Sequence, residues 1–158
     1  MSQNQKPVAG YTITIPGEIS RHRLTIPGRL PGLNEYTSAC RSNHMAGAAM
    51  KQESQDIVLW AIRAKMRNVH FTKPVFLLFT FYERDRRRDR DNVASYARKV
   101  IQDALVKAGT LEDDGWDYVT GYMDAFKVDN QNPRIVVEFI EQEAKPKCSK
   151  RQNKKSEK

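Results

Sequence analysis

Residues 93–109 read VASYARKVIQDALVKAG and form the most regular pattern in the chain. Apolar side chains recur there at spacings of three and four residues, which is the period of a helix with one buried face. These side chains are Val93, Tyr96, Ala97, Val100, Ile101, Ala104, Leu105 and Ala108. Gly109 follows, and glycine is the residue that most often ends a helix. The stretch therefore predicts an amphipathic helix that packs one face on another layer of structure.

Short segments rich in β-branched and aromatic residues lie on both sides of this helix and predict strands. The predicted strands are 22–27, 75–82, 118–128 and 135–140, with 11–16 as a possible extra N-terminal strand. Residues 48–66 contain no Gly or Pro and predict a second helix. Residues 28–47 read as a long surface loop, and 129–133 (DNQNP) as the turn of a hairpin that joins the last two strands.

The predicted order is β-α-β-α-β-β, with an extra strand possible at its start. This order indicates the fold class α+β, a single small domain in which a mixed β-sheet carries two helices. A length of 158 residues fits one such domain. We expect an N-terminal extension over 1–20, the folded domain over 21–143, and a basic disordered tail over 144–158.

Composition narrows the protein class further. The chain has 39% hydrophobic residues, enough for a core, and its apolar runs are far shorter than the roughly 20 residues of a membrane helix. The first ten residues, MSQNQKPVAG, contain no apolar signal core. We therefore expect a cytoplasmic protein with no membrane partner. Cys40 and Cys148 cannot build a disulfide framework, and we expect both to be reduced.

The net charge of +8 is unevenly placed. Residues 145–158 contain seven basic residues and one acidic residue, so this tail carries most of the positive charge. Within the rest, residues 1–102 are basic, whereas 103–129 contain seven acidic residues and only two lysines. The tail suits either a solubility role or loose, salt-sensitive contact with phosphates.

The densest group of charged residues is ERDRRRDRDN at 83–92, where a predicted strand gives way to the long helix. If the chain is extended there, Asp89 and Asp91 lie on one side, and Asp91 or Asn92 can cap the helix. Arginine side chains bind phosphate oxygens, and paired carboxylates bind hard divalent cations. The candidate phosphate-binding residues are Arg84, Arg86, Arg87, Arg88 and Arg90. Alternatively, the carboxylates only cap the helix and neutralise the arginines.

A second acidic cluster, Glu112-Asp113-Asp114, follows the helix. Carboxylates brought together from 89–91 and 112–114 could bind one or two Mg²⁺ or Mn²⁺ ions that activate water for phosphodiester hydrolysis. This pattern is compatible with a metal-dependent phosphodiesterase, although acidic turns are also common after helices that bind no metal. The alternative is a non-catalytic, basic nucleic-acid-binding protein.

The ordered set of these motifs resembles the RusA-type Holliday-junction resolvases, a family of crossover-junction endodeoxyribonucleases. The motifs are Asp89-x-Asp91-Asn92, Asp103-Ala-Leu, Lys107-Ala-Gly109 and Asp113-Asp114, with Pro31-x-x-Asn34-x-Tyr36 similar to an early loop of the family. The resemblance is strongest over 84–119 and more diffuse over about 21–143. It implies an endonuclease that resolves four-way DNA junctions in recombination, repair or phage replication, in a bacterial or phage-infected cell.

The resemblance also implies which residues act. Asp89, Asp91 and Asp114 match the three metal-binding carboxylates, with Mg²⁺ or Mn²⁺ as cofactor, and Asp113 is a neighbour of lesser weight. The family's catalytic lysine falls on Ser95 when counted from Asp91, and on Lys99 when counted from the Asp-Ala-Leu motif. We favour Lys99 because a cation can offset phosphate charge, although Lys99 can equally pair with Asp103 four residues on.

Chain geometry constrains Asp114. A helix over 92–108 spans about 25 Å, and the steps from Gly109 to Asp114 return at most about 17 Å. Asp114 therefore barely reaches Asp89 and Asp91, and it acts either within one chain or across a dimer. The resemblance and the symmetry of a four-way junction both imply a homodimer.

Other residues are candidates for DNA contacts, for the core or for a dimer interface. Tyr36 and Arg41 in the 28–47 loop are candidate DNA contacts. Trp60, Trp116 and Phe139 are expected in the core. Val93, Tyr96, Val100 and Leu105 are candidates for the dimer contact or, equally, for the core. The scattered histidines do not form a zinc site.

Overall fold

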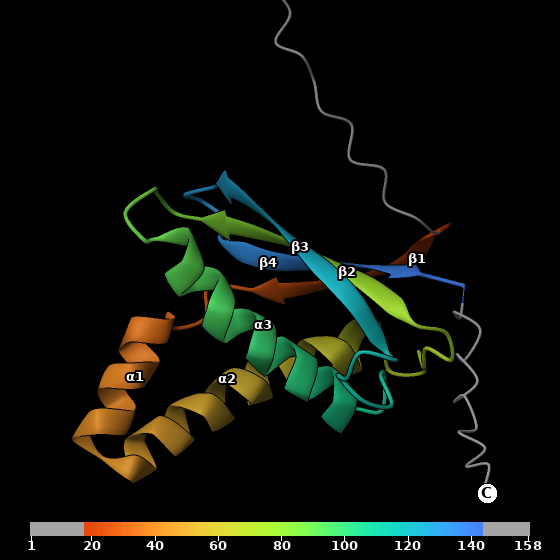
Figure 1. Cartoon of the computed structure of the whole chain (residues 1–158). Helices are drawn as coiled ribbons and strands as arrows, with labels where there is room; N and C mark the ends of the chain where they lie inside the picture. The colour runs from red at the N-terminus through yellow and green to blue at the C-terminus, as the bar shows by residue number, and fades with distance from the viewer. Residues whose placement is uncertain (1–17, 144–158) are drawn as a thin grey trace, which may run out of the picture.

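The computed structural model describes residues 18–143, which form four strands and three helices. In chain order these are β1 (Glu18–Pro27), α1 (Leu33–Ser42), α2 (His44–Lys65), β2 (Val75–Glu83), α3 (Arg90–Lys107), β3 (Val119–Val128) and β4 (Arg134–Glu141). The strands form one mixed sheet in the order β1-β4-β2-β3, in which β2 is parallel to β3 and antiparallel to β4. Figure 1 shows the helices on one face of this sheet. The predicted α+β class is confirmed.

The core lies between the helices and the sheet. Every second residue of β2 is buried, so Leu77, Phe79 and Phe81 point toward the helices with no exposed surface. The predicted apolar stripe of α3 meets them, with Val100 and Leu105 buried. α3 ends at Lys107, and Gly109, two residues later, has a φ of +76°, a backbone conformation that residues with a Cβ rarely adopt. The long helix is therefore confirmed, together with its stop.

The predicted hairpin between β3 and β4 is wrong. β2 lies between these two strands, and the 129–133 turn crosses the end of β2, where the Asp129 N–H donates to the Glu83 carbonyl at 2.7 Å. The reason is burial on both faces of β4, where Val136 and Val137 are both inaccessible to solvent, as suits a central strand. β3 is more exposed and lies at the sheet edge.

The predicted loop over 28–47 is also wrong, because most of it is helical, and the domain has three helices rather than two. Asn43 separates α1 from α2, and its side chain accepts a hydrogen bond from the Met45 N–H at 2.9 Å as the N-cap of α2. Gly47 lies against Cys40, whose Sγ would be 2.3 Å from an added Cβ. The polar and glycine residues that indicated a loop therefore cap a helix or allow a close contact between helices.

Some expectations fall on other parts of the chain. The possible strand over 11–16 and the basic tail over 144–158 lie outside the described residues. Within the described residues, no helix is both long enough and apolar enough to cross a bilayer.

Candidate active site

The start of α3 positions the first two predicted carboxylates. Asp89 is the N-cap residue, and its carboxylate accepts a hydrogen bond from the Asn92 N–H at 3.3 Å. Neither Asp91 nor Asn92 is the cap, contrary to prediction. Asn92 instead accepts a hydrogen bond from the Asn34 N–H at 2.7 Å and so fixes α1 to α3. Asp91 is left exposed in the first helical turn.

Asp124 on β3 is the carboxylate that the sequence patterns did not single out. It pairs with Phe79 of β2 and lies on the helix-covered face of the sheet, where it forms an ion pair with Arg98 of α3. Burial raises the pKa of the Asp124 carboxyl, the Arg98 guanidinium opposes this rise, and the nearby charge of Asp91 adds to it. An acidic residue at an inward position of an alternating strand was the available signal.

Among the described residues 18–143, one oxygen of Asp124 has no hydrogen-bond partner. Arg98 binds Oδ2, whereas Oδ1 is shielded from solvent and accepts no hydrogen bond. A shielded carboxylate oxygen without a donor is costly, and a neighbouring carboxylate increases that cost. A cation between Asp91 and Asp124 would relieve both effects.

Lys99 lies further along the same side of α3. Its Nζ is 2.8 Å from Asp103 Oδ1 and 2.9 Å from Asp114 Oδ2. Hydrogen bonds to these two carboxylates raise the pKa of Lys99, so it stays protonated. The pairing of Lys99 with Asp103 is therefore present, and Lys99 also fixes the loop that carries Asp114. Ser95 is half-buried one turn earlier.

Asp89, Asp91 and Asp114 do not meet in one ligand group. Lys99, which contacts Asp114, is eight residues from Asp91, or about 12 Å along the helix. Across residues 18–143, no three His, Cys, Asp or Glu side chains converge to hold a metal ion. Mg²⁺ commonly uses only one or two protein carboxylates together with water and substrate phosphate. Asp91 and Asp124 fit that smaller donor set.

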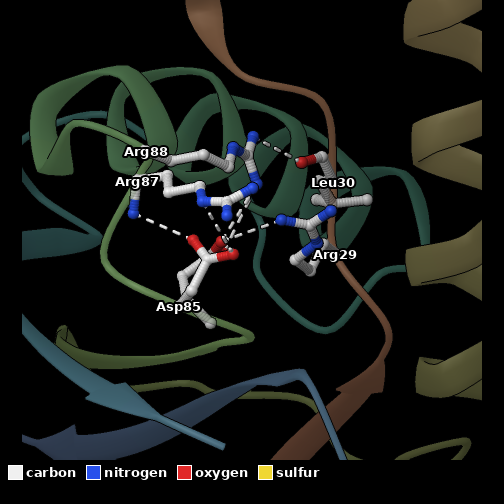
Figure 2. Close-up of polar contacts among 6 residues, drawn as sticks. Arg29, Leu30, Asp85, Arg87 and Arg88 are labelled. Carbon is white, nitrogen blue, oxygen red and sulfur yellow. Dashed lines mark hydrogen bonds and ion pairs between the residues drawn. The ribbon is translucent and has the colours of Figure 1, made fainter. Parts of the chain in front are cut away.

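The arginine stretch divides into internal and exposed members. Arg88 Nη1 is 3.4 Å from Glu83 Oε2, and its Nη2 donates to the Leu30 carbonyl at 3.0 Å. Figure 2 shows Arg29 and Arg88 directed into this buried network, while Asp85 accepts a hydrogen bond from the Arg87 N–H at 2.9 Å. Arg88 thus fixes the loop from inside the domain. The exposed members are Arg84, Arg86, Arg87 and Arg90.

The residues predicted to contact DNA, to lie in the core or to form the dimer differ in how deeply they are buried. Tyr36 is half-buried and its ring is 4.9 Å from that of Tyr96, while Arg41 is exposed at the end of α1. Phe139 is in the core as predicted. Trp60 and Trp116 are not, since 65% and 96% of their surface is exposed. The candidate dimer contacts Val93, Tyr96, Val100 and Leu105 all belong to the core.

The comparison with protein-family models gives no match to this chain, and the comparison with curated proteins gives none either. The likeness to RusA-type enzymes therefore depends on the motifs quoted above.

Proposed function

We propose that this protein is a divalent-metal-dependent endodeoxyribonuclease that resolves four-way DNA junctions. The observation that carries the proposal is the shielded Oδ1 of Asp124, which accepts no hydrogen bond from the described residues and lies within electrostatic range of Asp91 in the first turn of α3. Such a site can bind a cation and a phosphodiester together. The choice of a four-way junction as substrate comes from the motif resemblance.

In this proposal the basic residues bind phosphates and the acidic residues bind the cation. Arg84, Arg86 and Arg87 are exposed and bind the phosphates of the DNA backbone, which sets its position. Asp91 and Asp124 accept the cation. A bound Mg²⁺ or Mn²⁺ ion would activate water and stabilise the negative charge that develops on the phosphate.

Asp89, Asp114 and Lys99 remain functional residues in this proposal through the resemblance. Asp89 is two residues before Asp91 and orients the first turn of α3. Lys99 supplies a permanent positive charge, and its contact with Asp114 must open, or Asp114 must act on the site of a second subunit.

Separate binding and cleavage measurements on variants test the proposal. Asp91→Asn and Asp124→Asn should each reduce cleavage about 100-fold or more, because each removes a cation ligand. Asp89→Asn and Asp114→Asn should do the same. Junction affinity should stay equal or increase, since each change removes negative charge near the DNA. Asp56→Asn, an exposed change on α2, is the matched control and should leave both properties unchanged.

A readout independent of cleavage is Mn²⁺ binding to the protein, measured by electron paramagnetic resonance. Wild type should bind the ion, and Asp91→Asn and Asp124→Asn should weaken binding. If either variant binds Mn²⁺ and cleaves junctions as wild type does, the substituted residue is not part of the site.

One observation favours a second candidate, a non-catalytic nucleic-acid-binding protein. Arg98 and Lys99 already neutralise Asp124 and Asp114, as they would if the carboxylates only held the fold together. Such a protein would bind junctions through its arginines and would not cut them with any divalent ion.

A further inference from the structure

A cavity of about 910 Å³ lies where β2 ends, α3 begins and β3 ends. Its apolar surface comes from Val93 on α3 together with Phe126 and Val128 on β3. Its polar rim includes Arg86 and Arg87. An aromatic and aliphatic floor under a cationic rim suits a ligand with a flat ring and an attached anion.

The cationic side chains around the cavity differ in how they are held. Arg90 lies over the Phe126 ring, with its guanidinium carbon 5.6 Å from the ring centre, and Phe81 stacks on the same ring, so the two residues form a layered wall with the guanidinium as its outer surface. Lys127 lies 5.7 Å from the ring of Tyr82. Arg86 makes no ion pair with any residue in the described range 18–143. Arg86 is therefore available to a phosphate.

Both the floor of the cavity and the loop at its entrance contact the interior of the domain. Phe126 stacks on Phe81 of the core at 5.1 Å, and Arg88 anchors the arginine loop to Glu83 and Leu30. A preformed wall of this kind binds a ring without first having to order itself.

We propose that this cavity receives one unstacked nucleotide of the DNA, with its base against the Arg90–Phe126 wall and its phosphate at Arg86. The inference rests on the proposed function and names the structural feature of DNA that the site selects. Aromatic and guanidinium planes both stack on nucleobases, and arginine forks bind phosphate oxygens. Bases at a branch point leave the helical stack at lower cost than bases within a duplex.

The place of the cavity beside the carboxylates gives it a function. Asp89 lines the cavity, and Asp91 follows two residues later. A base held there places a neighbouring phosphodiester at the Asp91–Asp124 pair. The cavity thus favours cleavage next to a branch point over cleavage within a continuous duplex.

Junctions with one base removed test whether that base contacts the Arg90–Phe126 wall. Four-way junctions carrying a single abasic nucleotide, scanned around the branch point, are bound to wild type in chelator, where no cleavage occurs. One position should weaken binding about 5- to 150-fold, the usual effect of losing one base–aromatic stack. Phe126→Leu should bind the intact junction more weakly by a similar factor and show no further loss at that position.

Two more variants complete the design. Val128 is half-exposed, so Val128→Trp fills the cavity without disturbing the core and should reproduce the loss seen with Phe126→Leu. Trp60→Leu removes an exposed aromatic side chain from α2, away from the cavity, and should bind every junction as wild type does. Thermal unfolding confirms that each variant is folded.

The outcomes separate the two proposals. Metal-dependent cleavage with no abasic position that weakens binding, or with the same weakening in Phe126→Leu and Val128→Trp, overturns the nucleotide cavity and leaves the nuclease proposal intact. A wild-type protein that does not bind four-way junctions overturns both.

Discussion

Asp103 connects two helices through a single carboxylate. It accepts hydrogen bonds from Lys51 of α2 at 2.9 Å and from Lys99 of α3 at 2.8 Å. Burial acts to raise the pKa of Asp103, but the hydrogen bonds from Lys99 and Lys51 outweigh it, so this pKa lies below its ordinary value of 3.8. Asp103 therefore holds α2 to α3 and orients Lys99.

This lowered pKa predicts a pH-dependent stability. A carboxyl with a depressed folded-state pKa stabilises the fold above its ordinary pKa, and this contribution is lost as the pH falls through the folded-state value. Asp103→Asn should cost about 0.5–1 kcal/mol of unfolding free energy at pH 7, and the difference from wild type should shrink as the pH falls below 3.8 and vanish below the folded-state pKa of Asp103. Urea unfolding at several pH values measures it, with Asp56→Asn as control. A difference that stays constant into acid would contradict the ionic role.

Lys99 itself shows what residue patterns can and cannot predict. Its pairing with Asp103 follows from helical spacing alone, because residues four apart share a face. Its contact with Asp114 depends on how the chain turns after Gly109, which spacing does not specify. Residue patterns also missed the role of Asp124, because only the pairing of β3 with β2 places this side chain beside α3.

At the scale of elements, the loop between β2 and α3 combines a buried ion pair with exposed arginines. Arg88 and Glu83 are 16% and 11% exposed at their side chains and pair inside the domain. Arg84, in the same loop, is exposed. We therefore propose that Arg88 stabilises the domain and that Arg84 contacts DNA.

Substituting these two arginines separates the roles. Arg88→Ala should lower the unfolding free energy by about 2–3 kcal/mol, because it leaves the Glu83 carboxylate buried with Arg29 as its remaining partner. Arg84→Ala should change stability by less than about 0.5 kcal/mol but weaken DNA binding and reduce its salt dependence by about one phosphate contact. Urea unfolding and salt-dependent binding measure the two effects. Equal stability of the two variants would contradict this assignment.

Element order was harder to predict than element type. The periodicity of residues 93–109 was enough to predict α3, and the run of apolar and aromatic residues over 75–82 was enough to predict β2. The sheet order was not predictable from the short 129–133 connection, because it depends on β4 finding its most buried position between β1 and β2. The sequence did not predict α1, because glycine and asparagine residues usually indicate loops. Here they cap helices or lie in close contacts.

At the scale of the whole molecule, the helices cover one face of the sheet (Figure 1), and Arg98 of α3 pairs with Asp124 of the edge strand β3. The arginine loop lies at one end of α3 and the acidic 112–117 loop at the other. Substrate phosphates are therefore expected at the arginine end.

A two-fold dimer remains the assembly that we propose, because a four-way junction presents two equivalent strands. Since Val93, Tyr96, Val100 and Leu105 are in the core, the dimer must use another surface. Light scattering at micromolar concentration should give twice the chain mass of 18.2 kDa. Mixed dimers of wild type and Asp91→Asn should nick one strand of a junction. Resolution of both strands by a monomer would disprove the dimer.

The most direct test of the nuclease proposal is the incubation of purified wild-type protein with a synthetic four-way junction in Mg²⁺, Mn²⁺ or chelator, beside a linear duplex of the same sequence. We predict paired cuts near the branch point with either metal, none in chelator, and far less cleavage of the duplex. Junction binding without cleavage at any concentration of either metal would contradict the nuclease and favour the non-catalytic binding protein.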